Sequence, residues 1–367
     1  MVVRPRARSK WLVGEFRAAE LDFLSMVTVL SPSYDAATTT NRTGDRWMRR
    51  RSFSAAAAAA CALPWHAARG ADEFPARPIQ VIVPYAAGGA DTYIRPLQPA
   101  LEKRHGLQTV IESVVGAGGT VGSARVKRSA ADGYTLLFCG SGALTIAPRL
   151  QEAAGAPTLA DFVPLLNLVT IPYIIALKKG SPIRDVRQLL DFIKSKPGAL
   201  SYGSPGTGSA PHLGMEALAR ALGSSVTHIP FSGIATAMQS LLGGHLDAVI
   251  GAPSTVMPQV EGGAVAGIAV TGKARFPLAP AIPTLAEAGV DVDVATHFAF
   301  YAPKGTPPAV VNKLTQAFSD SASEPVFRQA MEATRTQVEL LAPDALARVL
   351  QDEQRRFEPV ILAIKGK

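Results

Sequence analysis

The chain has 367 residues, of which 47% are hydrophobic and 18% are charged, and its formal net charge is +8. Residues 1–71 hold 11 Lys and Arg against 5 Asp and Glu, whereas the remainder holds 26 against 24 and is nearly neutral. The folded part shows no Lys/Arg stripe with interleaved aromatic residues, which argues against nucleic acid as a partner. Its length predicts two domains.

Residues 1–71 have the features of an export leader preceded by an extension. Within 48–71, three arginines precede a short alanine-rich run, which is typical of a secretory signal and too short to span a bilayer. Residues 50–53, Arg-Arg-Ser-Phe, also resemble a twin-arginine signal. We expect translation to begin at Met48, residues 1–47 to be a start-site artefact, and the mature protein to be periplasmic. The alternative is that the whole segment is a disordered tail.

The first half of the folded part alternates buried-type strands with helical patterns. The predicted strands are 79–83, 108–112, 134–139, 165–169 and 173–177, and the predicted helices are 92–105, 121–129 and 185–196. Asp91 is a candidate N-cap for the first helix. Pro96 and Pro99 predict that this helix starts late or kinks, because a proline beyond the first turn removes a hydrogen bond.

The second half continues the alternation. The predicted strands are 200–203, 226–229, 248–250, 267–270 and 294–301; the predicted helices are 212–222, 235–242, 284–288, 307–319, 324–334 and 343–364. This alternation predicts an α/β protein with parallel sheets and helices on both faces. Residues 170–177 and 294–301 are candidate crossings between domains, which suggests a hinge around a cleft. One lobe would then hold residues 74–172 and 298–367, and the other would hold residues 173–297.

Glycine-rich turns follow several of the predicted strands. They occupy residues 84–91, 116–122, 140–142 and 204–209. A strand, glycines and a helix start together expose backbone N–H groups, and glycine lets a ligand approach them closely. No row of catalytic side chains accompanies these turns. The pattern therefore predicts binding of a small anion rather than catalysis.

Eight further segments give the chain a recognisable signature. They are Pro-Ala-Arg-Pro-Ile at 75–79 with Val-Pro-Tyr at 83–85, Gly-Ala-Gly-Gly at 116–119, Ala-Asp-Gly-Tyr-Thr-Leu-Leu at 131–137, Asp-Phe-Val-Pro at 161–164, His-Ile-Pro-Phe at 228–231, Leu-Leu-Gly-Gly-His-Leu-Asp at 241–247, Pro-Thr-Leu-Ala-Glu-Ala-Gly at 283–289 and Ala-Pro-Lys-Gly-Thr-Pro at 302–307. In this order and spacing the chain resembles the substrate-binding proteins of tripartite tricarboxylate transporters, also called the Bug family.

The resemblance implies a two-lobed periplasmic-binding-protein fold of the Venus flytrap type II. It also implies a monomer without a cofactor that captures a small carboxylate between its lobes, performs no catalysis and delivers the ligand to membrane permease subunits. The chain departs from the family pattern at three candidate site positions. Residues 88–91, Gly-Gly-Ala-Asp, are one residue shorter than usual, Gly251 and Ala252 replace a common Asp-Asn pair, and His297 replaces a frequent Trp. The identity of the carboxylate therefore stays open.

The candidate ligand-binding residues come from the turns and from these departures. They are Tyr85, Gly88, Gly89, Ala90, Asp91, Ser141, Gly142, Ser204, Gly206, Thr207, Ser209, Gly251 and His297. Asp91 either caps its helix and faces away or reaches the ligand through a water. The hydroxyls at 204–209 either clamp the second end of the ligand or cap the following helix. His297 would add a pH-sensitive contact. The neutral pair at 251–252 predicts a pocket that prefers apolar or aromatic monoacids over citrate or aspartate.

Two other interpretations compete with these. The turn at 116–122 approaches the G-x-G-x-x-G fingerprint of a secreted dinucleotide-dependent oxidoreductase, but its third glycine is one place late. Tight packing of a helix on a strand is the other role for this turn. His212 and His228 are expected to make structural hydrogen bonds rather than to bind a metal, because their spacing does not suit a metal site.

Overall fold

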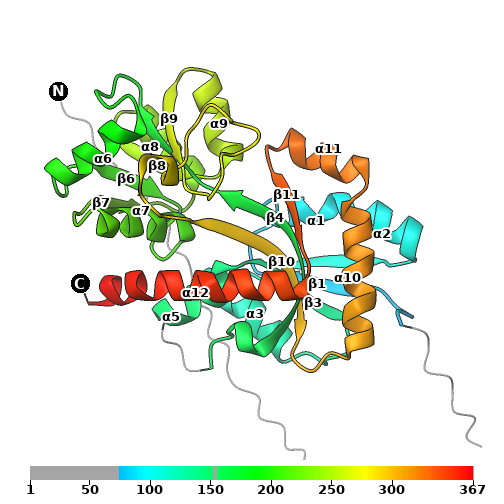
Figure 1. Ribbon diagram of the computed structural model, residues 1–367. Coiled ribbons are helices and arrows are strands. Elements are labelled where there is room, and N and C mark those ends of the chain that lie inside the picture. The colour runs from blue at the N-terminus through cyan, green and yellow to red at the C-terminus, as the bar shows by residue number, and fades with distance from the viewer. Residues whose placement is uncertain (1–73, 152–154, 367) are drawn as a thin grey trace, which may run out of the picture. The chain divides into compact units, whose positions relative to one another are not determined.

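The computed structural model describes residues 74–151 and 155–366 (Figure 1). All of them belong to the unit Ala67–Lys367. The predicted export leader, the proposed start at Met48 and the twin-arginine segment lie outside the described residues. Among the residues described, no helix combines the length and the hydropathy needed to cross a membrane.

The first sheet has six strands in the order β11-β4-β10-β3-β1-β2. Its strands are β1 (Ile79–Val83), β2 (Thr109–Ser113), β3 (Thr135–Gly140), β4 (Phe162–Pro172), β10 (Ala295–Pro303) and β11 (Gln337–Leu341). β1 pairs in parallel with β2 and β3, as the alternating pattern predicted. β10 runs antiparallel to β3 and β4, and β11 antiparallel to β4, so the expectation of a wholly parallel sheet is wrong.

The second sheet has five strands in the order β7-β6-β8-β5-β9. Its strands are β5 (Ile174–Lys178), β6 (Ser201–Ser204), β7 (Thr227–Pro230), β8 (Ala248–Gly251) and β9 (Val265–Val270). β6 is parallel to β7 and β8, whereas β5 is antiparallel to β8 and β9. Both sheets are mixed for the same reason, because β10 in the first and β5 in the second, each the strand that follows a crossing, run against the parallel strands beside them.

The chain passes between the two sheets at the two predicted places. β4 ends at Pro172 and β5 begins at Ile174, so only Tyr173 separates them. The return runs from the end of β9 to the start of β10 at Ala295. Residues 295–297 already pair with β4, whereas the predicted lobe boundary follows residue 297. That boundary stays a prediction.

Helices connect the strands. They are α1 (Asp91–Ile94), η1 (Arg95–Leu97), α2 (Gln98–His105), η2 (Ala117–Gly119), α3 (Thr120–Lys127), α4 (Gly142–Thr145), α5 (Ala147–Gln151), η3 (Leu159–Asp161), α6 (Val186–Ser195), α7 (Ala210–Ala221), α8 (Ile234–Leu242), α9 (Pro253–Glu261), η4 (Ala286–Ala288), α10 (Pro308–Ala322), α11 (Pro325–Ala333) and α12 (Pro343–Lys365). The pattern over 92–105 divides into α1, η1 and α2, as its two prolines predicted. Helix α9 and strand β11 were not predicted.

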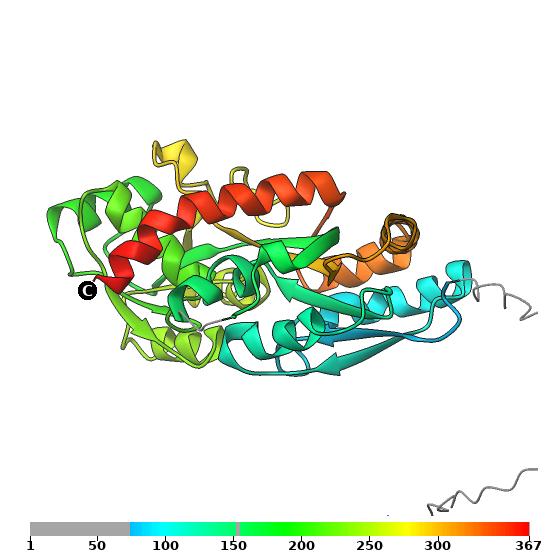
Figure 2. The same ribbon diagram turned by 90° about the horizontal axis from the view of Figure 1, so that it is seen from below.

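Alternate residues of the first sheet face two different helical layers. Phe138 and Phe300 belong to one cluster with Leu97 of η1 and Phe318 of α10. The residues next to them along the strands, Cys139, Ala299 and Tyr301, belong to a second cluster with residues of α3, α4 and α12. Helix α12 contacts β4 in the first sheet and α7, which follows β6 of the second sheet (Figure 2). The two sheets are therefore joined by α12 as well as by the two crossings.

Asp247, the last residue of the 241–247 motif, joins the second sheet's strands by its side chain. Its Oδ2 accepts from the amide of Ser201 at 3.0 Å and from the hydroxyl of Ser201 at 2.6 Å. Its Oδ1 lies 2.7 Å from Nζ of Lys178. Partial burial alone would raise the pKa of Asp247, but the hydrogen bonds from Lys178 and Ser201 outweigh it and lower that pKa.

Replacing Asp247 by asparagine should reduce the free energy of unfolding by about 1 kcal/mol at pH 7, because the side chain is partly exposed and its charge is screened. A lowered pKa in the folded state stabilises the fold above the unfolded pKa of about 3.9. The difference in the free energy of unfolding between this variant and the wild type should therefore decrease as the pH falls below about 4. Urea unfolding at several pH values measures this, with exposed Asp191→Asn as the control. An unchanged difference at pH 3 would contradict the electrostatic account.

Candidate functional site

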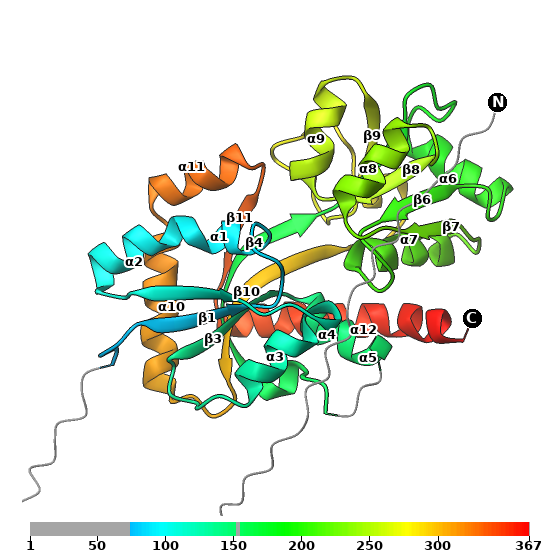
Figure 3. The same ribbon diagram turned by 180° about the vertical axis from the view of Figure 1, so that it is seen from behind.

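The turns after β1 and β3 meet at one edge of the first sheet. Because β1 and β3 are parallel, their carboxyl ends lie at the same edge. The Tyr85 hydroxyl, just beyond β1, accepts a hydrogen bond of 3.2 Å from the amide of Gly140 at the end of β3. Antiparallel β10 places Phe298 opposite Gly140. Open α/β sheets bind ligands at such carboxyl edges, which are visible from behind in Figure 3.

The first turn presents backbone donors that no acceptor among the described residues uses. Gly88 has φ +83, and the amide of Gly89 donates to the carbonyl of Ala86. Within the described part of the chain, no hydrogen-bond acceptor is assigned to the amides of Gly88, Ala90 and Asp91. Tyr85 is half-buried and the two glycines are exposed. Three N–H groups of this turn are therefore without an acceptor among the described residues, that of Gly88 at an exposed residue and those of Ala90 and Asp91 at buried ones.

Asp91 does not cap its helix, so that prediction is wrong. The N-cap is Ala90, with no side-chain cap, and Asp91 is the first helical residue. Its side chain is buried, with Oδ2 2.9 Å from Nε of Arg95. In the described residues its Oδ1 has no hydrogen-bond partner. The carboxylate turns toward Arg95 because this ion pair one helical turn away satisfies one of its oxygens.

The turn after β3 offers two more donors. The amide of Ser141 donates to the carbonyl of His297 at 2.8 Å, and the Ser141 hydroxyl accepts from the amide of His297 at 3.4 Å. The next two amides, of Gly142 and Ala143, have no acceptor among residues 74–151 and 155–366. The side chain of Ser141 is buried, whereas Gly142 is half-buried. Of the two amides without an acceptor in the described residues, that of Gly142 thus belongs to a half-buried residue and that of Ala143 to a buried one.

The turn at 204–209 uses its hydroxyls internally. Ser204 is buried, and its Oγ lies 2.7 Å from Nε2 of His228. Ser209 is the N-cap of α7, and its side chain accepts from the amide of His212. Thr207 is exposed at the tip, beside Gly206 with φ +126. The capping alternative is confirmed for Ser209, and Thr207 keeps a hydroxyl that faces solvent.

This second-sheet turn also touches the first sheet's helices. A Cβ on Gly208 would lie 2.6 Å from Cδ1 of Leu150 in α5. Gly251 stands at the same edge of the second sheet as Ser204, because β6 and β8 are parallel. A Cβ there would lie 2.4 Å from Cγ1 of Ile234, so glycine lets α8 pack on β8. The close approach at Gly208 places the 204–209 turn, which was predicted to hold the second end of the ligand, next to α5.

Four residues at this place were missed from the sequence. The Tyr173 hydroxyl, in the crossing, lies 2.5 Å from Oγ1 of Thr296. The ring of Phe298 lies edge-on to Tyr93 at 5.0 Å and to Tyr85 at 6.2 Å. Burial raises the pKa of Tyr85 and of Tyr93, so both phenols are neutral and able to donate. Alternation along the predicted strand 294–301 could have grouped Thr296 with Phe298 and separated both from His297.

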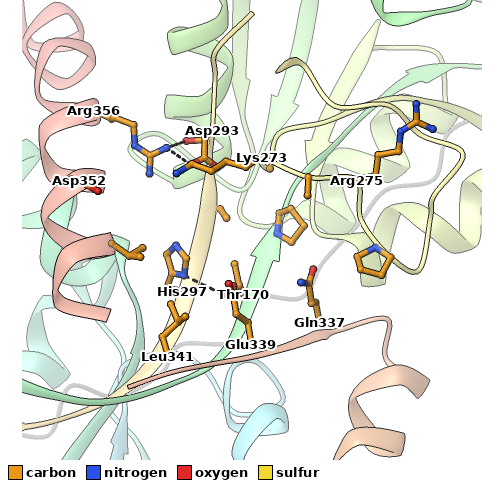
Figure 4. A pocket seen from close by; sticks show the side chains of 16 residues that line it. Thr170, Lys273, Arg275, Asp293, His297, Gln337, Glu339, Leu341, Asp352 and Arg356 are labelled. Atoms are coloured by element: carbon orange, nitrogen blue, oxygen red, sulfur yellow. Dashed lines mark hydrogen bonds and ion pairs between the residues drawn. The ribbon is translucent and has the colours of Figure 1, made fainter. Parts of the chain in front are cut away.

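His297 does not face the edge where the turns after β1 and β3 meet, but lines a separate cavity. Successive side chains of a strand point to opposite faces, and its imidazole opens into a cavity of about 320 Å³ (Figure 4). Its Nδ1 lies 3.1 Å from Oγ1 of Thr170. Arg356 of α12 pairs with Asp293 in the same cavity. Burial lowers the pKa of His297, although the Glu339 and Asp293 charges act in the opposite direction. The imidazole of His297 therefore lies on the opposite face of β10 from the side chains of Thr296 and Phe298.

The turn at 116–122 is a packing device. A Cβ on Gly119 would lie 2.9 Å from Cβ of Ala143, and one on Gly122 would lie 2.8 Å from Cβ of Pro84. These contacts confirm the prediction of tight helix–strand packing.

The rings of His212 and His228 stack at 4.0 Å and hydrogen-bond to the 204–209 turn, as expected for structural histidines. In the described residues, no group of three or more His, Cys, Asp and Glu could hold a metal ion.

Comparison with known proteins gives a consistent result. Residues 93–365 match the family described as "Tripartite tricarboxylate transporter family receptor". The "UPF0065 protein in gbd 5'region" of Cupriavidus necator is 35% identical over 77% of this chain and 88% of its own length. Protein BugT of Bordetella pertussis is 31% identical over 79% of this chain and 90% of its own length.

Solved structures show the same two-lobed fold. A TctC solute-binding protein from Polaromonas, without ligand, has a TM-score of 0.71 at 29% identity, covering 79% of this chain and 99% of its own. MatC from Rhodopseudomonas palustris with bound malate has a TM-score of 0.66 at 30% identity, with 78% and 100% covered. A further R. palustris protein, Rpa4515 with adipate, has a TM-score of 0.68 at 26% identity, with 78% and 97% covered. The chain, with its α/β lobes and its two crossings, belongs to the tripartite tricarboxylate transporter receptor family of solute-binding proteins.

Proposed function

We propose that this protein captures a small carboxylate at the edge where the turns after β1 and β3 meet, as an extracytoplasmic solute receptor. The observation that carries the proposal is the set of amides in these turns that have no acceptor within residues 74–151 and 155–366, those of Gly88, Ala90, Asp91, Gly142 and Ala143. Converging N–H groups bind a carboxylate without a cationic side chain. Two similar structures hold the dicarboxylates malate and adipate. The family match gives no support to the oxidoreductase alternative.

The neighbouring side chains suggest the ligand class. Tyr85, Tyr93 and Phe298 form an aromatic wall beside the turns. Thr296 flanks Gly140 together with Phe298, and its hydroxyl lies 2.5 Å from that of Tyr173. Neutral phenols donate hydrogen bonds to an anion without repelling it, and aromatic rings pack against apolar carbon. We therefore favour a carboxylate with an apolar or aromatic body over citrate or aspartate.

In the proposed mechanism, the two lobes close over the bound ligand. The proposed lobes are residues 74–172 with 298–367, and residues 173–297. The 204–209 turn, with exposed Thr207, would close over the second end of the ligand. A ligand favours closure only through tighter binding to the closed state. In this scheme the receptor acts in the periplasm without catalysis and hands its ligand to membrane permease subunits.

Thermal unfolding with a panel of carboxylates should give a selective stabilisation. The panel holds benzoate, adipate, malate, citrate and aspartate, with NAD and FAD as controls. A ligand at 100 times its dissociation constant stabilises by about 2.7 kcal/mol, which raises Tm by roughly 5–10 °C. We expect benzoate or adipate to act more strongly than citrate or aspartate. The reverse order would contradict the ligand class, and a response to nucleotides alone would contradict carboxylate capture.

A further inference from the structure

A buried carboxyl group lies directly behind one of the ligand turns. Glu353 of α12 is 2% exposed, and its Oε1 lies 2.6 Å from Oγ1 of Thr145 in α4. In the described part of the chain, its Oε2 has no hydrogen-bond partner. The same Thr145 hydroxyl lies 2.9 Å from the carbonyl oxygen of Ser141. Glu353 therefore supports the turn whose amides of Gly142 and Ala143 have no acceptor among the described residues.

Counting protons at this contact indicates a neutral carboxyl group. A threonine hydroxyl has one hydrogen, so Thr145 can donate either to the Ser141 carbonyl or to Glu353, but not to both. Both contacts become hydrogen bonds only if Glu353 carries a proton and donates it to Oγ1 of Thr145. An ionised carboxylate could accept from Thr145 only if the Ser141 carbonyl lost that hydrogen bond, and its charge would stay buried, which is costly even with the Ser141 hydroxyl nearby.

The groups around Glu353 act on its ionisation in both directions. Burial raises the pKa of Glu353 to about 7 and the Asp293 charge also raises it, although the Thr145 and Ser141 hydroxyls and the Arg356 charge lower it. The phenols of Tyr301 and Tyr173, which come from β10 and the crossing, interact with this carboxyl group, and burial raises the pKa of each so that both are neutral.

Two charged groups near Glu353 have other partners. Arg356 is paired with Asp293. Arg149 of α5 contacts the carbonyl of Gln354 rather than Glu353. In the described residues, no cation makes a direct ion pair with this carboxyl group.

We propose that Glu353 is a positioning residue that takes up a proton when a carboxylate binds the amides of Gly142 and Ala143. The inference rests on the proposed function. A ligand carboxylate on one side of this turn and an ionised Glu353 on the other are like charges, and each disfavours the other. Binding therefore favours the protonated form of Glu353, in which both Thr145 contacts are hydrogen bonds. By linkage, the ligand binds more tightly where Glu353 is already neutral.

The expected effect follows from the sign of this coupling. If binding raises the pKa of Glu353 by about one unit, roughly half a proton is taken up per ligand at pH 7.5. The dissociation constant then rises up to about tenfold between pH 6 and pH 9. In Glu353→Gln the side chain is neutral at every pH and its amide donates to Thr145. This variant should show no proton uptake, and its affinity should match the wild type at pH 6 and exceed it at pH 9.

Calorimetric titration of the whole protein with the carboxylate that gives the largest thermal shift tests the proposal. Titrations at pH 7.5 in phosphate, HEPES and Tris separate proton uptake from intrinsic heat, because these buffers differ in ionisation enthalpy. Glu358→Gln, an exposed residue of the same helix, is the matched control and should keep the wild-type pH profile.

Each outcome decides between the two proposals. Absence of binding by every carboxylate in the panel would overturn the proposed function. Binding by the wild type without proton uptake and without pH dependence would overturn only the role of Glu353, even if the Gln variant failed to fold. A Gln variant that kept the wild-type pH profile would also overturn it. Proton uptake lost in Glu353→Gln and kept in Glu358→Gln would support it.

Discussion

Replacing Gly142 by aspartate should weaken carboxylate binding at least about 100-fold, because it places a negative charge on the amides that we assign to the ligand. The backbone tolerates the change, since a Cβ at this position would meet only Cδ1 of Ile146, at 3.4 Å. Two like charges about 4 Å apart repel by about 4 kcal/mol near a protein surface, and solvent reduces this value in part. Calorimetric titration measures the loss directly.

Gly142→Asn is the matched control for this prediction. Asparagine has the same shape as aspartate but no charge, so it should weaken binding by less than about tenfold if charge dominates. The aspartate variant should also recover part of its affinity at high salt, because salt screens exposed charges. Equal losses in both variants would show a steric effect, and an unaffected aspartate variant would remove this turn from the site.

Replacing Phe300 by alanine should lower the free energy of unfolding by about 3–5 kcal/mol, the cost of a large cavity in a packed core. Phe300 is 1% exposed, stacks on Phe318 with ring centroids 4.1 Å apart, and lies 4.7 Å from Phe138. Its strand, β10, also holds Thr296 and Phe298 at the site. The loss should therefore appear in urea unfolding and in weaker carboxylate binding if β10 shifts.

Two further variants serve as controls for this measurement. Phe300→Leu keeps most of the apolar volume and should cost clearly less than the alanine variant. Val326→Ala changes a side chain that is 73% exposed and should alter stability by less than about 0.5 kcal/mol. A loss below about 1 kcal/mol for Phe300→Ala would show that the aromatic cluster contributes little to the fold.

The regular elements follow from local sequence where the pattern is strong. Helix α6 was predicted over 185–196, and Asp185 caps it by accepting from the amide of Gln188. Helix α9 was missed because prolines at its first turn and at Pro258 hide the pattern. Strand β11 was missed because all of its residues are only half-buried at the edge of the sheet, so no clear alternation marks it.

The resemblance to the receptor family implied the two-lobed fold, whereas the sequence's own patterns determined the alternation of strands and helices, the two crossings and the turns that could bind an anion. These depend on periodicity, glycine and proline, which act over a few residues. Only the tertiary structure decided which amides are free, which face of β10 meets the aromatic wall, and that Glu353 lies behind Ser141. These features depend on contacts between segments far apart in the chain. Such contacts form only when strands and helices pack, and a local pattern carries no information about them.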